Sequence, residues 1–128
     1  MFKKIKYFIQ RGRRGYSDED VWSFDHYLCE IIPPALRQIK EKGAGCPSEY
    51  YDEKNKNNEC KPWHEILEEI AQGFESAKIL INHDITIWKE NKDGNYTMET
   101  DHPKAEQASK KMKRGLALFS EHFLNLWD

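Results

Sequence analysis

The chain has 128 residues, of which 38% are apolar and 33% are charged, and its formal net charge at neutral pH is -2. This length fits one domain, and an aromatic content of 12% excludes a wholly disordered chain. The slightly acidic balance gives no general attraction to nucleic acid. We therefore expect no long nucleic acid as a partner, and any anion binding must be local.

The cysteines and the hydropathy pattern indicate where the protein works. Cys29, Cys46 and Cys60 are odd in number and contain no CxxC pair. Together with the lack of a signal peptide, this pattern favours a reducing, cytosolic setting. No segment has the apolar run that a membrane span requires, so we expect no membrane partner.

Residues 1–10 form a short N-terminal element that is both basic and apolar. Phe2, Ile5, Phe8 and Ile9 have helical spacing, although alternation over residues 5–9 would suit a strand equally well. We expect this element to pack on the domain or on a neighbouring molecule. A membrane-surface helix is the alternative, but this length would support it only weakly. Residues 11–15 read as a basic turn flanked by glycines.

The clearest helix start is at Ser17. Its hydroxyl can accept a backbone N–H of the first turn, and Asp20 can reach back to Ser17, as in a capping box. Pro33-Pro34 stops or kinks this helix, because neither residue has an N–H to donate. Two neighbouring stripes, one of them apolar, run along it: Val21, Phe24, Leu28, Ile31 and Ile32, and beside them Trp22, Asp25, His26 and Cys29. We interpret this helix as the centre of the domain.

A long loop separates this helix from the next. Helix resumes at Pro34 and ends before Gly43, and residues 44–61 are rich in turn formers and charge. Pro62 opens a helix that we expect to extend through Trp88. Glycine costs a helix interior ~1 kcal/mol, so we attribute Gly73 to a close crossing with another helix. The predicted buried face consists of Trp63, Ile66, Leu67, Ile70, Phe74 and Ala77.

The last helix follows a connecting segment over residues 90–101, which contains a turn at 91–95. It begins at Asp101 or His102 with Pro103, and the apolar C-terminus should be docked rather than frayed. Its predicted buried face consists of Ala105, Ala108, Met112, Leu116, Phe119, Phe123 and Leu126.

These elements predict an all-α fold in a single domain, residues 1–128. The expected architecture is an antiparallel bundle of three long helices, the first one broken at Pro33-Pro34, plus the short N-terminal element. The aromatic residues exceed what one such core needs, so we predict a homo-oligomer.

No motif in the chain specifies a reaction. Asp25 and His26 are adjacent, so they point about 100° apart on a helix and form no dyad; a satisfied histidine is the favoured interpretation of His26. Cys60 and His64, with Cys46 across the loop, lack a fourth zinc ligand, so we predict no metal and no cofactor. Enzyme activity is the minority interpretation, with a metal-dependent phosphodiesterase as its form.

Arginines beside aromatic side chains suggest a ligand site instead. Arginine can fork onto a phosphate while an aromatic ring stacks on a base. Alternatively, the arginines pair with the acidic residues 18–20. The candidate ligand-binding residues are Arg13, Arg14, Tyr16, Trp22 and His26, with Lys110 and Arg114 from another helix.

Three strings resemble a family of small, uncharacterised proteins of tailed phages and prophages. They are RGYSDEDVWSFDHYL at residues 14–28, WHEIL with IAQGFE over residues 63–75, and the LF-x3-F-x2-LWD ending at 118–128. The resemblance covers most of the chain outside residues 44–61, which look like an insertion. It implies a phage origin and work in the cytoplasm of the infected bacterial host.

Small oligomeric phage proteins without catalytic motifs include some that sequester nucleotide signals of host defence. By this analogy of class, we hypothesise a non-enzymatic accessory protein that binds a small anionic nucleotide-type ligand. The alternative is a structural or host-takeover protein whose aromatic faces contact other proteins.

Overall fold

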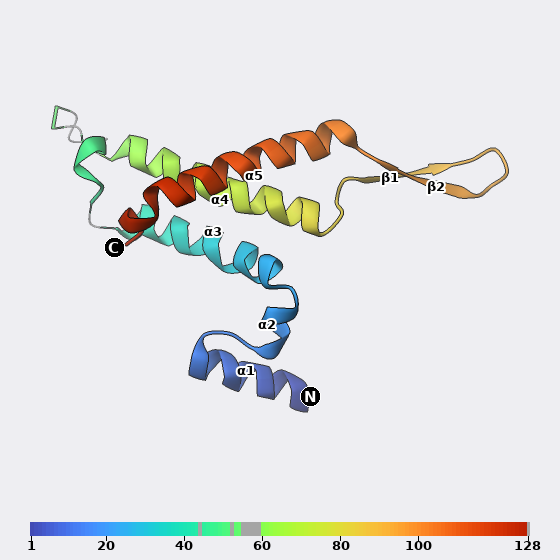
Figure 1. Cartoon of the computed structure of the whole chain (residues 1–128), viewed down its shortest axis with the longest axis horizontal. Helices are drawn as coiled ribbons and strands as arrows, with labels where there is room; N and C mark the ends of the chain where they lie inside the picture. The colour runs from blue at the N-terminus through green and yellow to red at the C-terminus, as the bar shows by residue number, and fades with distance from the viewer. Residues whose placement is uncertain (44, 52, 55–59, 128) are drawn as a thin grey trace.

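The computed structural model describes residues 1–43, 45–51, 53–54 and 60–127, and most of them are helical, as predicted. The elements in chain order are α1 (Phe2–Arg14), α2 (Asp18–Trp22), α3 (Phe24–Lys42), the 3-10 turn η1 (Ser48–Tyr50), α4 (Lys61–Ile81), β1 (Thr86–Glu90), β2 (Tyr96–Thr100), α5 (His102–His122) and the 3-10 turn η2 (Phe123–Asn125). Figure 1 shows α3, α4 and α5 as the body of the molecule, with α1 and the β1–β2 hairpin projecting from it.

The body is centred on α4. Successive long helices run in opposite directions (Figure 1), and α4 packs extensively against both α3 and α5. Among the described residues no contact of similar extent joins α3 to α5. A closed three-helix bundle would need that third contact, so the observed arrangement is a row of helices with α4 in the middle.

The core confirms the predicted face of α4. Ile70 and Leu67 are almost wholly buried, and Leu36 of α3 and Leu118 of α5 belong to the same cluster. The other buried apolar residues of α4 are Trp63, Ala71, Phe74 and Ala77. Because α4 is buried along so much of its length, it has the central role that we predicted for the helix starting at Ser17.

Two glycines set the distance between α4 and α5. A Cβ on Gly73 would lie 2.6 Å from the Cα of Gly115, and a Cβ on Gly115 would lie equally close to the Cα of Gly73. The two backbones therefore touch where neither residue has a side chain. This is the close crossing that Gly73 predicted.

The prediction of a break at Pro33-Pro34 is wrong. Helix α3 continues through both prolines, and the break lies earlier, at Ser23, between α2 and α3. Cys29, Pro33 and Leu36 are all buried on one face of α3, so tertiary packing offsets the hydrogen bonds that the prolines cannot make. Consequently the predicted stripe is not the buried face: its members Val21, Phe24 and Ile31 are exposed.

Three further boundaries differ from the prediction. Helix α1 continues to Arg14, through the expected basic turn, and ends where Gly15 adopts a left-handed conformation. Helix α4 ends at Ile81, short of Trp88, because the chain enters a β-hairpin around the predicted turn, with Gly94 at φ 82°. The third difference is at the C-terminus, where Leu124 and Trp127 are largely exposed while Leu126 packs against the core cluster, so the predicted docking holds only in part.

The predicted buried face of α5 is confirmed in part: Ala108 is buried, and Met112 and Phe119 pack against the core cluster. The other buried residues are Gly115, Leu118 and His122, whereas the predicted Leu116 and Phe123 are exposed. The reason is Gly115, which must face α4 for the two backbones to touch.

Of the predicted loop over residues 44–61, positions 44, 52 and 55–59 lie outside the described residues.

Gly73→Ala should lower the free energy of unfolding by about 2 kcal/mol, because the new methyl group overlaps the backbone of Gly115. Gly12→Ala is the matched control: no atom lies within 4 Å of a Cβ there, and alanine should favour the helix by up to about 1 kcal/mol. Urea unfolding of both variants measures the difference. Equal stability of the two variants would contradict the crossing.

Candidate functional site

A buried capping box begins α2 and connects α1 to the body. The backbone N–H of Ser17 donates to Oδ2 of Asp20 at 2.7 Å, and the N–H of Asp20 donates to Oγ of Ser17 at 3.3 Å. Both residues are buried. This confirms the predicted helix start and leaves the carboxylate of Asp20 fixed in position.

Helix α1 is clamped to this capping box by its polar side chains. Arg11 donates from Nε to Oδ2 of Asp20 at 2.9 Å, and this bond holds the pKa of Asp20 well below its usual range. Gln10 donates from Nε2 to Asp18 at 2.8 Å and accepts the backbone N–H of Asp18 at 2.9 Å. The hydrogen bond from Gln10, followed by those from Arg14 and Lys6, lowers the pKa of Asp18.

Helix α3 holds the other side of this joint. The hydroxyl of Tyr27 donates to the carbonyl oxygen of Gly15 at 2.6 Å, at the residue that ends α1. Gly15 has φ 82°, which an L side chain rarely adopts, so the turn depends on glycine at this position. The orientation of α1 is therefore defined from both α2 and α3.

The N-terminal members of the predicted ligand site lie around this joint. Arg14 stacks on the ring of Tyr16, with 4.6 Å from Cζ to the ring centroid, and pairs with Asp18. For Arg14 the structure therefore shows the second alternative, in which the arginine pairs with an acidic neighbour. Arg13 makes no ion pair within the described residues, and Trp22 is 91% exposed. Nε2 of His26 lies 3.7 Å from Oε1 of Glu30, and the ring is only half-buried.

The two predicted residues of α5 lie on a different surface. Arg114 donates from Nε to Oε1 of Glu69 at 3.1 Å, and Nζ of Lys110 lies 3.3 Å from Oε1 of Glu106. Both line a groove of about 200 Å³ between α4 and α5, whose lining residues include none of the N-terminal candidates. The structure does not bring the two groups together, and their role in ligand binding stays a prediction.

The sequence interpretation missed a disulfide. Cys46 and Cys60 are joined, with 5.7 Å between their Cα atoms, whereas Cys29 is a free, buried thiol whose pKa is raised by desolvation. The sequence did not predict this pair because the number of cysteines is odd and the two cysteines are far apart in the chain. Disulfides are rare in a reducing cytosol, so the pairing runs against the compartment that the sequence favours.

Next to the disulfide is an aromatic cluster that the sequence also did not reveal. The buried ring of His122 lies edge-on to Trp63 at 5.5 Å and to Tyr50 at 5.6 Å, and Nε2 of His122 is 3.4 Å from the hydroxyl of Tyr50. The helical period could have predicted the burial of His122, because it follows Leu118 by four residues on α5 and so lies on the same face. The cluster joins the end of α5 to the start of α4 and to η1.

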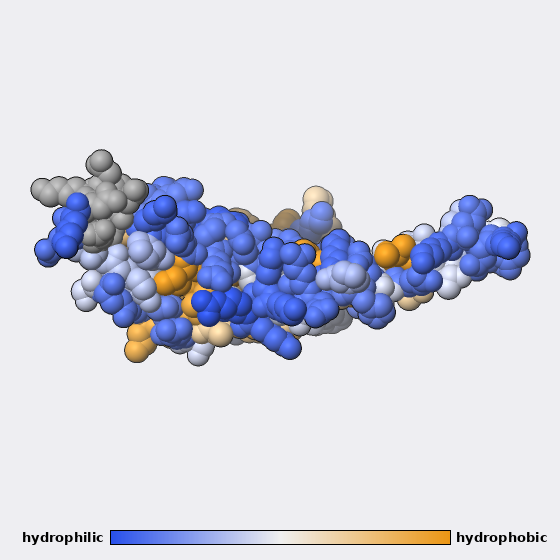
Figure 2. Space-filling view, turned by 90° about the horizontal axis from the view of Figure 1, so that it is seen from above, coloured by the Kyte–Doolittle hydropathy of each residue, from blue (hydrophilic) through white to orange (hydrophobic). Residues whose placement is uncertain are grey.

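The β1–β2 hairpin presents one apolar face. Trp88 lies directly opposite Met98, and Tyr96 opposite Glu90, so alternation places these four side chains on the same side of the sheet. Trp88, Tyr96 and Met98 are 66%, 64% and 63% exposed. The other side carries Ile87 together with three polar residues, and Nζ of Lys89 lies 2.6 Å from Oε2 of Glu99. Figure 2 shows how far the hairpin extends beyond the body, with most of the visible body surface hydrophilic.

Two features of the described residues concern the predicted partners. Within the described ranges, no three His, Cys, Asp or Glu side chains gather as metal ligands, and Cys60 is committed to the disulfide. None of the helices, in the part of the chain that the structure covers, is long and apolar enough to cross a membrane.

Comparisons with known proteins add no relative. No protein-family model, no curated protein and no solved structure matches this chain. The phage resemblance therefore stays a prediction, and the function must be argued from the surfaces described above.

Reduction of the disulfide should destabilise the protein. The bond closes a loop across a sequence separation of 14, for which loop-closure entropy gives about 3 kcal/mol. Urea unfolding with and without dithiothreitol measures this loss. A Cys46→Ser/Cys60→Ser double variant should start at the lower stability and not respond to the reductant. An equal response in this variant would show that the effect does not come from this bond.

Proposed function

We propose that this protein is a non-enzymatic interaction module that assembles into a homo-oligomer through its β-hairpin. The observation that carries the proposal is the apolar face formed by Trp88, Tyr96 and Met98 on a two-stranded sheet that stands away from the body. An isolated two-stranded hairpin is at best marginally stable in water. A partner that covers this face would stabilise the sheet.

The size of the apolar face is sufficient for association. An aromatic side chain of ~200 Å² that is two-thirds exposed gains about 3 kcal/mol when it is buried. The outer edges of β1 and β2 are also unpaired within the described sheet, so a second hairpin can extend it by backbone hydrogen bonds. A two-fold arrangement lets the same face serve both copies.

The proposal favours the interaction-protein alternative over nucleotide sequestration. The contact that best resembles a nucleotide site is Arg14 on Tyr16, but the charge of Arg14 is already paired with Asp18. An accessory role in phage-infected bacteria, in the host cytoplasm, belongs to the same proposal and rests on the resemblance alone. We do not propose catalysis.

Trp88→Ser should weaken self-association roughly 100-fold, the equivalent of the apolar energy lost from one buried aromatic side chain. Sedimentation equilibrium over a range of concentrations measures the change. Trp22→Ser is the matched control, because it removes the same side chain from an exposed site on α2. A wild-type chain that is monomeric at all concentrations, or dissociation by Trp22→Ser alone, would contradict the proposal.

A further inference from the structure

Helix α1 presents an apolar stripe that none of the described residues covers. Phe2, Ile5, Phe8 and Ile9 lie within a narrow arc when successive residues are turned by about 100°. All four are at least half exposed, and none of the residues of α1 is buried. For an amphipathic helix in a folded chain this is unusual, because the apolar stripe normally faces the core.

The stripe faces outward because α1 is held by its opposite side. The side chains that contact α2 are Lys6, Gln10, Arg11 and Arg14. Arg14 follows Ile5 by nine residues, which is a rotation of roughly 180° at 100° per residue. The clamp on Asp18 and Asp20 thus fixes the apolar stripe on the side away from the body.

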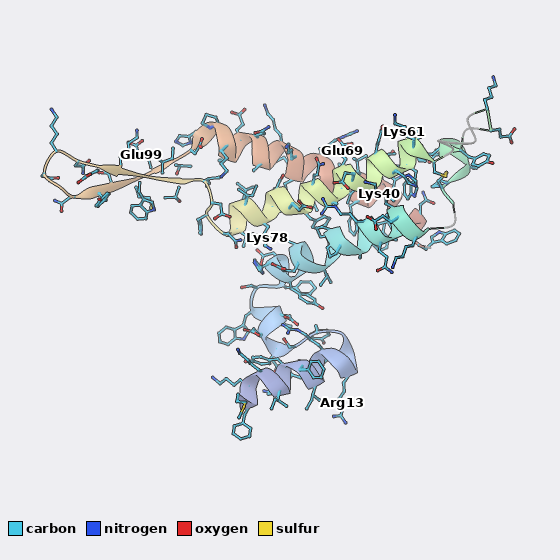
Figure 3. All side chains as sticks on the ribbon, turned by 180° about the vertical axis from the view of Figure 1, so that it is seen from behind. Arg13, Lys40, Lys61, Glu69, Lys78 and Glu99 are labelled. Atoms are coloured by element: carbon cyan, nitrogen blue, oxygen red, sulfur yellow. A yellow bond between two sulfur atoms is a disulfide. The ribbon has the colours of Figure 1, made fainter. Side chains whose placement is uncertain are left out.

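The charge of α1 is opposite to that of the rest of the chain. The helix contains six Lys or Arg residues and no Asp or Glu, whereas the rest of the chain has 14 Lys or Arg against 22 Asp or Glu. Lys4 and Arg13 have no ion pair among the described residues, and at 100° per residue they flank the two edges of the stripe. Figure 3 shows Arg13 directed away from α2 and the body.

The stripe and one of the unpaired cations, Arg13, meet in a shallow groove. A hollow of about 520 Å³ runs along α1 and is lined by apolar Phe2, Ile5 and Ile9 together with Lys6, Gln10, Arg13 and Arg14. An occupant of this surface must offer apolar atoms to the stripe and negative charge to its flanks. The headgroup boundary of an anionic bilayer offers both along the full length of a helix.

We propose that α1 binds the surface of anionic phospholipid bilayers and lies in the plane of the interface. The apolar stripe enters the boundary between headgroups and acyl chains. Lys4 and Arg13 reach the lipid phosphates while their methylene groups cover the edges of the stripe. The structure extends the helix beyond the ten residues that the sequence predicts and turns it outward, which makes surface binding stronger than the sequence indicates.

A second copy of the chain is the competing occupant, and it fits less well. Only residues of α1 line this hollow, so a protein partner would have to supply a fitted apolar surface with acidic residues along it. A bilayer needs no fitted shape, since its lipids rearrange around the helix. Bilayer binding does not depend on the hairpin. It can therefore fail while self-assembly through the hairpin holds, and self-assembly can fail while bilayer binding holds.

Flotation of the full-length protein with vesicles tests the proposal. Vesicles of phosphatidylcholine with roughly one third phosphatidylglycerol should bind the chain at least about 10-fold more strongly than pure phosphatidylcholine vesicles. Lys4→Glu/Arg13→Glu should lower the partition coefficient by about 10-fold or more, and Phe8→Ser by a similar factor.

Two controls match these variants in chemistry but not in place. Lys111→Glu/Lys113→Glu makes the same change in net charge on α5, and Leu124→Ser removes an apolar side chain that is as exposed as Phe8. Both should bind anionic vesicles like the wild type, and so should Trp88→Ser. Circular dichroism and urea unfolding verify that each variant is folded.

The outcomes are distinct. No flotation of the wild type with anionic vesicles would overturn the proposal, and so would an equal loss in the Lys111/Lys113 variant, which would reduce the effect to net charge. A Phe8→Ser variant that still floats but sediments as a smaller species would assign the stripe to a second copy. Loss of flotation confined to the α1 variants supports the bilayer.

Discussion

The fold depends on the contact between two helix backbones at Gly73 and Gly115. Without a Cβ on either residue, α4 and α5 approach until the backbone itself forms the interface. Close-packed interiors transmit such a constraint, since neighbouring side chains have no free volume in which to adjust. The rotation of α5 that directs Gly115 at α4 also directs Leu118 and His122 inward. His122 then completes the cluster with Trp63 and Tyr50, next to the disulfide.

The third helix is attached to α4 by a different combination of forces. Cys29 and Leu36 contribute apolar packing, while Arg37 pairs with Glu68 and Glu75 of α4. The hydrogen bond from Arg37 lowers the pKa of Glu68 to about 2, so this carboxylate remains charged at ordinary pH. Helix α3 thus lies on α4 with an apolar contact and a partly exposed ionic one.

The apolar surface that the body cannot use lies on its two projections. The hairpin carries Trp88, Tyr96 and Met98 on one side, and α1 carries its stripe on the side opposite to its clamp. In both cases polar contacts lie on the side opposite to the apolar one: Lys89 with Glu99 within the hairpin, and Arg11 with Asp20 between α1 and α2. The proposed functions use these two sides, one for another copy of the chain and the other for a lipid surface.

The sequence by itself determined the features that depend on a few neighbouring residues. Ser17 and Asp20 specify a capping box, the spacing from Trp63 to Ala77 specifies the buried face of α4, and Gly73 indicates a close crossing. In each case the cause is local geometry, namely the reach of a side chain, the helical period, or a missing Cβ. The phage resemblance also comes from the sequence alone, and the structure does not test it.

Only the tertiary structure decided which faces are covered. Pro33 lies within an unbroken helix because its burial against α4 outweighs its local preference, and Arg14 is committed to Asp18 because α1 folds back onto α2. Cys46 meets Cys60, and Arg114 meets Glu69, across distances in sequence that no local pattern records. The outward direction of the α1 stripe depends on the clamp and the Gly15 turn together. Periodicity gives a helix its apolar side, but contacts with distant segments determine where that side points.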